Sequence, residues 1–103
     1  MLQDSSKSVQ RTEGELVVER DVIVRTEGGL HAIVATRITA IAEDCGAKVL
    51  LALTGDPLYQ VDASKLMAVL SLGVAAGESL TVTCDGVGAD RTLDAIIAVL
   101  SDD

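Results

Sequence analysis

The most specific stretch of this chain reads VDASKLMAVLSLGVAAG over residues 61–77. Its apolar side chains between Leu66 and Leu70 fall at helical spacing. Ser64 stands just before them, where a hydroxyl can accept a hydrogen bond from the backbone of a helix's first turn. The stretch therefore predicts a short helix of about two turns, capped by Ser64 and ending toward Gly73.

Strand and helix patterns surround this segment. Runs of β-branched and aliphatic residues indicate strands, and apolar residues at positions i, i+3, i+4 and i+7 indicate helices. The charged residues Glu19, Arg20 and Asp21 interrupt the first strand and predict a bend or an edge there. The order of elements favours an α+β domain with helices on one face of an antiparallel sheet. The predicted strands are 16–24, 48–54, 58–61 and 80–84. The predicted helices are 32–45, the short helix that follows Ser64 and ends toward Gly73, and 93–100.

Length and composition indicate one small domain. The chain has 103 residues, of which 49% are hydrophobic, so we expect a single core over residues 16–103. Residues 1–15 are polar and unpatterned, and they predict a flexible tail.

The charge and the side-chain inventory exclude several kinds of partner. A formal net charge of −8 repels a phosphate backbone, and Tyr59 is the single aromatic residue available to stack on bases. We therefore expect no nucleic-acid partner. No apolar stretch is long enough to span a bilayer and the N-terminus lacks the features of a secretory signal, so we expect a cytoplasmic protein without membrane insertion. The acidic charge also favours a monomer.

The two cysteines do not predict a metal site. Cys45 and Cys84 are too few and too far apart in sequence for a metal-ligand pattern, and each lies in an apolar pattern. We expect buried, reduced thiols and no bound metal.

The single histidine, His31, stands where a glycine turn gives way to a helical pattern. The first backbone N–H groups of a helix have no intrahelical partner and point along the positive end of the helix dipole, so they suit a phosphate. Here Ala32 and Ile33 supply such groups. A neutral imidazole at this place can accept a phosphoryl group. Taken alone, however, one histidine in a small acidic domain is more often an ordinary surface residue.

The run Gly29-Leu30-His31-Ala32, the element order and above all residues 61–77 resemble the HPr family, the histidine-containing phosphocarriers of the phosphoenolpyruvate-dependent phosphotransferase system. The resemblance covers about Asp21 to the C-terminus. It implies an open-faced β-sandwich, in which three helices cover one face of a four-stranded antiparallel sheet of order 1-4-2-3.

The resemblance also implies a function and a site. His31 would be the phosphoacceptor, on ring nitrogen Nδ1 in the family, taking the group from enzyme I and passing it to an acceptor protein of the EIIA type. No cofactor is needed. Leu66, Met67 and Leu70 match positions that form the apolar docking surface in the family, and we expect Lys65, Met67 and Leu70 to lie in the partner face. We expect Met67 and Leu70 to be partly exposed, and Leu66 and Val69 to be more buried.

Two departures from the family pattern bear on that function. Arginine and proline follow the family's histidine-alanine pair, whereas this chain has Ile33 and Val34. Without the arginine, a fixed cation beside the phosphoryl group is lost, with an expected effect on the order of tenfold to a thousandfold in rate. Arg37 lies six residues after His31, well over a helical turn away and on a different face of the helix from the histidine. We therefore expect Lys65, and not Arg37, to lend the positive charge.

The second departure is at Lys65 itself, since many family members have a regulated serine there. Here the serine is Ser64, one residue earlier, and we expect it to act as a helix cap and not as a regulatory phosphosite.

Two other functions stay open on the sequence. The chain could be a regulatory or adaptor domain that keeps the fold and the partners but has lost phosphoryl transfer. It could also be a ferredoxin-like small-molecule sensor domain, which shares part of the element order but has a different strand order in its sheet. The sheet topology distinguishes the sensor domain from the other two.

Overall fold

The sheet is built around β5 (Ser79–Gly86), which pairs antiparallel with β2 (Glu15–Ile23) on one edge and with β3 (Ala47–Leu53) on the other. Side chains of β5 alternate strictly between buried and half-buried positions from Ser79 to Asp85, as the period-two pattern predicts. The computed structural model describes residues 7–12, 15–56 and 58–101.

Five strands form one sheet in the order β1-β2-β5-β3-β4. The outer strands are β1 (Lys7–Thr12), paired with β2, and β4 (Val61–Asp62), paired with β3. The four strands from β2 onward, numbered along the chain, lie in the order 1-4-2-3. This confirms the expected HPr-like topology and contradicts the ferredoxin-like alternative.

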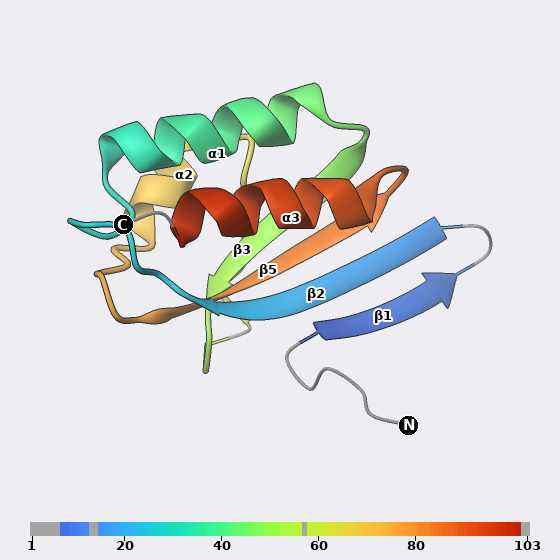
Figure 1. Ribbon diagram of the computed structural model, residues 1–103, viewed down its shortest axis with the longest axis horizontal. Helices are drawn as coiled ribbons and strands as arrows, with labels where there is room; N and C mark the ends of the chain where they lie inside the picture. Colours follow the sequence, from blue (N-terminus) through green and yellow to red (C-terminus); the bar gives the residue numbers. More distant parts are fainter. Residues whose placement is uncertain (1–6, 13–14, 57, 102–103) are drawn as a thin grey trace.

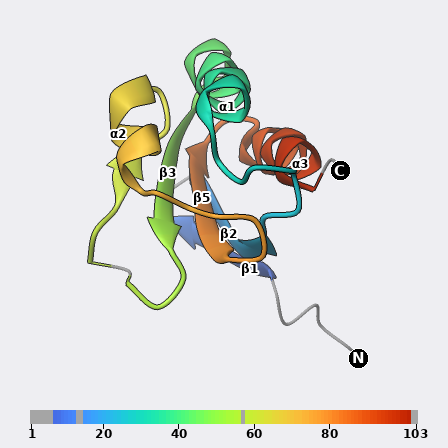
Figure 2. The ribbon, with the colours of Figure 1, turned by 90° about the vertical axis from the view of Figure 1, so that its left-hand side faces the viewer.

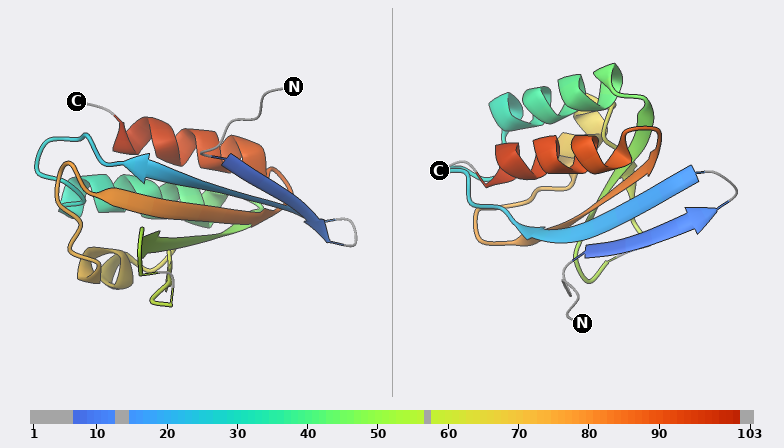
Figure 3. Two further views of the ribbon diagram at one scale, coloured as in Figure 1. Left: turned by 90° about the horizontal axis from the view of Figure 1, so that it is seen from below. Right: turned by 45° about the vertical axis from the view of Figure 1, so that its right-hand side comes forward.

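Three helices cover one face of the sheet: α1 (Ala32–Asp44), α2 (Leu66–Ser71) and α3 (Ala89–Leu100). Figure 1 shows α1 and α3 side by side above the strands, and Figure 2 shows α2 on the other side of α1. Seen from below in Figure 3, the strands lie in front of the helices, so no described element covers that face. The core lies between the two layers, and its largest fully buried side chains are Ile38, Leu51, Leu80, Leu93, Ile96 and Leu100.

The segment expected to be part of a flexible tail contributes a strand. Lys7–Thr12 form β1 and pair with Glu15 to Arg20 of β2, which corrects the prediction for those residues. The backbone of β2 has a second edge that β5 does not occupy, and backbone hydrogen bonds can pair it with a neighbour of almost any sequence. The polar composition of Lys7–Thr12 therefore gave no side-chain pattern from which β1 could be predicted. Residues 1–6 and 13–14 of the predicted tail lie outside the described residues.

The bend expected at Glu19, Arg20 and Asp21 is wrong, because β2 runs through them. Glu19 and Arg20 lie between two strands, whereas Asp21 lies just beyond the last β1 pair, Lys7 with Arg20, and pairs only with β5. The carboxylates of Glu19 and Asp21 stand on the open face. Thr83 Oγ1 donates to Glu19 Oε2 at 3.1 Å, and Thr81 Oγ1 donates to Asp21 Oδ1 at 2.7 Å. Cross-strand hydrogen bonds of this kind make a charged residue compatible with a central strand.

The hairpin predicted from β3 to residues 58–61 is shorter than expected, since β4 has only two residues. The helices agree better with their predicted ranges: α1 begins right after His31, and α3 begins before the predicted start of its apolar stripe. Among the described residues, none of the helices combines the length and the apolar run that a bilayer crossing requires.

Both cysteines are free thiols, as predicted. Cys84 is fully buried in β5, whereas Cys45, at the end of α1, is only partly buried. Its sulfur lies 3.1 Å from the carbonyl oxygen of Ala47 and 3.3 Å from that of Ala42. Burial, and secondarily the nearby Cys45, raise the pKa of the Cys84 thiol to about 12.

Alkylation checks this difference between the two thiols. Because Cys84 is buried and remains protonated at pH 8, iodoacetamide should modify Cys45 much faster than Cys84 in the folded protein. Peptide mapping by mass spectrometry after timed labelling measures the two rates. Labelling in concentrated urea is the control, and there the labelling rates of Cys45 and Cys84 should become similar. Equal rates in the folded protein would contradict the burial of Cys84.

Candidate functional site

Three segments that are distant in the sequence meet in front of the start of α1. The loop after β2 receives the end of α3, because the N–H groups of Arg25 and Thr26 both donate to Leu100 O, at 2.8 and 3.3 Å. The same loop meets the segment that follows α2, since Leu30 N–H donates to Val74 O at 2.9 Å. Figure 1 shows this convergence at the left-hand end of the molecule. Backbone bonds to two other elements therefore hold the loop that carries His31.

Glycines make this close approach possible. Gly29 has a φ of +72°, and a Cβ atom added there would lie 2.5 Å from Val74 O and 2.8 Å from Ala76 N. Gly28 has a φ of +83°, and an added Cβ would lie 2.9 Å from Cδ2 of the His31 ring. Any other residue at these positions would be strained by its φ and would collide with the backbone or with the imidazole.

His31 is the N-cap residue of α1. Its backbone is extended (φ −89°, ψ −178°), and its Nδ1 atom accepts a hydrogen bond from Ile33 N–H at 3.3 Å. The ring is exposed to solvent. Because Nδ1 accepts, its lone pair is free of a proton in this arrangement and the ring proton is on Nε2. The structure thus directs Nδ1 toward the backbone donors of the helix start.

The first turn of α1 presents donors without carboxylates. It contains no acidic residue, and Ala32 and Ile33, the two predicted phosphate-binding residues, both lie in it. Their side chains are exposed, and that of Ile33 is 69% exposed. The positive end of the helix dipole is therefore not neutralised by an acidic side chain of that turn.

A shallow hollow of about 300 Å³ lies beside this turn, lined by Ala32, Ile33, Thr36 and Arg37. Ile33 and Arg37 are four residues apart and so share a helix face. Arg37 is therefore a neighbour of Ile33 one turn further along the helix.

The start of α2 is organised differently from the prediction. Lys65, and not Ser64, is the N-cap residue, and its side chain makes no capping hydrogen bond. The Ser64 hydroxyl donates to Asp62 Oδ1 at 2.8 Å, and Ser64 N–H donates to the same oxygen at 2.9 Å. The capping role predicted for Ser64 is wrong, because a carboxylate two residues earlier engages its hydroxyl in a turn of its own.

These two bonds affect the ionisation of Asp62. The Ser64 backbone bond and then its hydroxyl bond lower the pKa of Asp62 below the ordinary value of 3.8, and Lys65 and Lys48 lower it further against the opposing effect of burial. The ionised carboxylate is therefore the form that the turn before α2 requires.

The exposure of the apolar residues of α2 agrees with the prediction at Met67, Val69 and Leu70, whereas Leu66 is less buried than expected. Val69 is fully buried, and Met67 is 76% exposed. Leu66 and Leu70 are both partly buried against the core. The hydroxyl of Tyr59, which is 51% exposed, lies 3.2 Å from Ser71 Oγ at the end of the helix. Hydrophobic periodicity gives no signal for Tyr59 at this surface, because the contact joins a loop to a helix.

The contact between the α2 region and the His31 loop is made by the segment after α2, where Val74 O accepts from Leu30 N–H. Lys65 stands at the opposite end of that helix, on the exposed surface. Leu70 lies closer along the chain to the segment that touches the His31 loop. The predicted docking residues are therefore spread along α2 and are not gathered at the imidazole.

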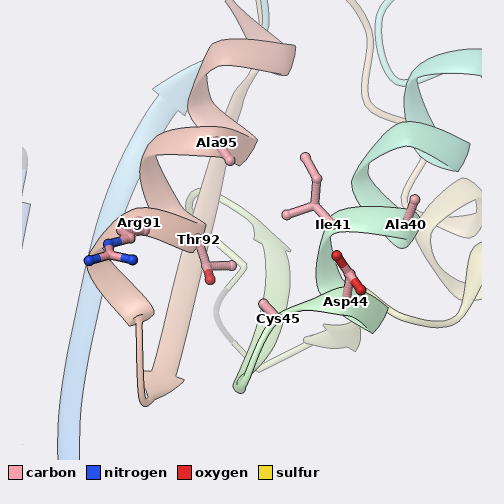
Figure 4. Close-up of a pocket in the computed structure, with 7 residues that line it drawn as sticks. All are labelled: Ala40, Ile41, Asp44, Cys45, Arg91, Thr92 and Ala95. Carbon is pink, nitrogen blue, oxygen red and sulfur yellow. The ribbon is translucent and has the colours of Figure 1, made fainter.

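A second hollow, of about 390 Å³, lies between α1 and α3 (Figure 4). It is flanked by the C-terminal part of α1, with Asp44 and Cys45, and by the first turns of α3, with Arg91 and Thr92. This is the end of α1 away from His31, so the hollow is separate from the candidate site. Within residues 7–12, 15–56 and 58–101, no three histidine, cysteine or acidic side chains come together as metal ligands would.

Comparison with known proteins identifies the family. Residues 18–102 match the family model described as the PTS HPr component phosphorylation site. The chain belongs to the HPr family. A phosphocarrier protein HPr from Haloferax volcanii is 37% identical over 84 residues, which cover 82% of this chain and 93% of that protein. A phosphocarrier protein NPr from Shewanella violacea is 30% identical over 83 residues, covering 81% and 88%.

Solved HPr structures have the same fold. The crystal structure of an HPr from Bacillus anthracis superposes with a TM-score of 0.75 at 27% identity, covering 82% of this chain and 96% of that one. The strand order and the placement of three helices on one face are thus those of HPr proteins. β1 lies before residue 18, so this strand lies outside the segment matched by the HPr family model.

The Gly29 contact can be tested by substitution. Gly29→Ala should lower the free energy of unfolding by about 3 kcal/mol or more, because it adds a clash with the Val74–Ala76 backbone to the strain of a positive φ. Gly73→Ala is the matched control, since its φ is similarly +61° but its added Cβ meets nothing within 4 Å. The control should lose about 1 kcal/mol in urea unfolding. Similar losses in both variants would contradict the close approach at Gly29.

The Asp62 turn predicts a pH-dependent loss of stability. Asp62→Ala should lower the free energy of unfolding at pH 7 by about 1 kcal/mol. A carboxyl group whose pKa is lowered in the folded state stabilises the fold above its unfolded pKa of 3.8, and this contribution is lost as the pH falls through the lower folded pKa. The difference between wild type and variant in urea unfolding should therefore shrink toward pH 3.

Asp62→Asn provides the comparison, because its amide oxygen can still accept the Ser64 bonds without carrying a charge. It should lose less stability than Asp62→Ala and show a weaker pH dependence relative to wild type. A difference that stays constant between pH 7 and pH 3 for Asp62→Ala would show that the carboxylate charge has no such role.

Proposed function

We propose that this chain is a phosphocarrier of the phosphotransferase system that accepts a phosphoryl group on His31 from enzyme I and passes it to an EIIA-type acceptor protein. The observation that carries the proposal is the hydrogen bond between Ile33 N–H and His31 Nδ1 at the exposed start of α1. It joins a ring nitrogen with an available lone pair to a backbone donor suited to phosphate oxygens. Membership of the HPr family supports the same role.

The chemistry proposed is an in-line displacement at phosphorus. The Nδ1 lone pair of His31 forms a bond to the phosphorus while the bond from phosphorus to the donor's ring nitrogen breaks, and that electron pair returns to the donor imidazole. The proton on Nε2 of His31 stays in place during the attack. As Nδ1 turns to phosphorus, Ile33 N–H is released from it and can donate to a phosphoryl oxygen, together with Ala32 N–H.

Backbone donors take a larger share of the charge stabilisation in this proposal than an HPr with the motif arginine would require. Ile33 cannot supply a cation, and the first turn of α1 contains no acidic side chain that would oppose the incoming phosphoryl group. Lys65, an exposed residue at the start of α2, is proposed to add positive charge to the surface on which a partner docks.

We assign partner docking to Lys65, Met67 and Leu70, which are spread along α2, a helix that packs against α1. Met67 is a large apolar side chain left mostly in water, which favours a surface that is covered in a complex. Ser64 remains a predicted non-phosphorylated residue: a phosphate on its hydroxyl would lie against the Asp62 carboxylate that now accepts its hydrogen bond. A cytoplasmic monomer is the form in which we expect the carrier to act.

One observation favours a second candidate, a regulatory or adaptor domain that binds the same partners without transferring phosphate. The exposed Ile33 occupies the place of the motif arginine, and an apolar side chain there can hold a complex together without helping the chemistry.

Phosphorylation in vitro distinguishes the two candidates. With phosphoenolpyruvate and enzyme I, the wild-type chain should gain the mass of one phosphoryl group, and acid should remove it, because phosphohistidine is acid-labile. His31→Ala should abolish the gain, and Ser64→Ala should leave it unchanged. Intact-protein mass spectrometry before and after acid treatment measures the result.

A conventional HPr labelled under the same conditions is the positive control. Circular dichroism of His31→Ala checks that loss of the N-cap has not unfolded the chain. If the control is labelled and the wild-type chain is not, the phosphocarrier proposal is wrong and the adaptor function is favoured.

A further inference from the structure

We infer that Ile33 is a specificity-determining residue, and that the surface this chain docks against carries an apolar side chain over the start of α1 and places its carboxylates around that contact. The inference rests on the proposed function and adds the chemistry of the partner surface.

The position of Ile33 makes it part of any complex that reaches the imidazole. Its own N–H is the group that donates to His31 Nδ1, so a donor atom approaching Nδ1 has to pass close to the Ile33 backbone. Its side chain is 69% exposed. A β-branched side chain in water at this place gains free energy when a partner covers it with apolar atoms.

The surroundings of Ile33 are shaped for such a contact. The hollow of about 300 Å³ beside it is lined by Ala32, Ile33, Thr36 and Arg37, so methyl and methylene groups form much of its wall. A partner carboxylate placed directly over Ile33 would lose its hydration without gaining a hydrogen bond from that side chain. An apolar partner side chain loses nothing in this way.

The distribution of charge places the partner's carboxylates at the rim. The chain has a net charge of −8, yet residues 30–42 and 63–77 contain no aspartate or glutamate. These two segments include the first eleven residues of α1 and the whole of α2, which pack against each other. Their only cationic residues are Arg37 and Lys65. A partner with an apolar centre and an acidic rim complements this face and is repelled by the rest of the molecule.

Binding without transfer tests the inference separately from the proposed function. Isothermal titration of the unphosphorylated full chain with enzyme I from the same organism, without phosphoenolpyruvate, gives the dissociation constant. Ile33→Ala should raise it on the order of tenfold, through lost apolar contact. Ile33→Arg should raise it at least as much, because a guanidinium would then be buried against apolar atoms.

Val87→Ala is the matched control. Val87 is another exposed apolar residue, at 85%, but it lies beside Gly46, at the other end of α1 from His31. Its substitution should leave the dissociation constant unchanged. Thermal unfolding of all three variants checks that none of these surface substitutions has disturbed the fold.

The possible results distinguish failure of the Ile33 inference from failure of the proposed phosphocarrier function. An unchanged dissociation constant for Ile33→Ala, a lower one for Ile33→Arg, or no measurable binding of the wild type overturns the inference. Phosphorylation of His31 together with any of these leaves the phosphocarrier function standing. Conversely, binding that depends on Ile33 without phosphorylation supports the inference and contradicts the phosphocarrier function. In transfer kinetics with enzyme I, Ile33→Ala should raise KM for the carrier by a larger factor than it lowers kcat.

Discussion

Backbone pairing of β5 with strands on both of its edges is the constraint on which the rest of this structure depends. Its register aligns Cys84 with Val18 of β2 on one side and with Val49 of β3 on the other, and all three side chains are buried. A slip of one residue would turn such a row to the open face and bring Thr81 or Thr83 into the core. The register of one strand therefore decides which face the helices can cover.

The same pairing builds the end of the molecule that carries the candidate site. Beyond the sheet, Val24 and the segment before β5 continue to exchange hydrogen bonds, Val24 N–H to Glu78 O at 2.9 Å and Gly77 N–H to Val24 O at 2.8 Å. This brings the loop after β2 against the segment after α2, where Gly29 permits contact between the two backbones. His31 is thus positioned by the backbone of segments far from it in the sequence, and its ring remains exposed.

At the site, one backbone N–H has two possible uses. In the free protein Ile33 N–H donates to His31 Nδ1, and the His31 ring thereby caps the helix. The same N–H group can donate to an anion once Nδ1 of His31 forms a bond to another atom. Because the donor belongs to the backbone, it does not depend on the side chain at position 33. That independence lets an apolar residue occupy a position two residues after His31, the proposed phosphoacceptor, without removing this backbone donor.

The sequence by itself determined the four-stranded topology, the helix start at His31 and the burial of Val69, because apolar periodicity and the family resemblance report local structure and which faces are buried. Periodicity could not detect β1, since strand pairing at an edge depends on backbone hydrogen bonds and not on a side-chain pattern. The sequence also predicted Ser64 as the cap of α2, although in the folded chain the Ser64 hydroxyl donates to the Asp62 carboxylate. Only the tertiary structure decided that Nδ1 of His31 faces Ile33 N–H, that Gly29 meets Val74 and that Ile33 stays exposed, because these depend on segments brought together by the folded backbone.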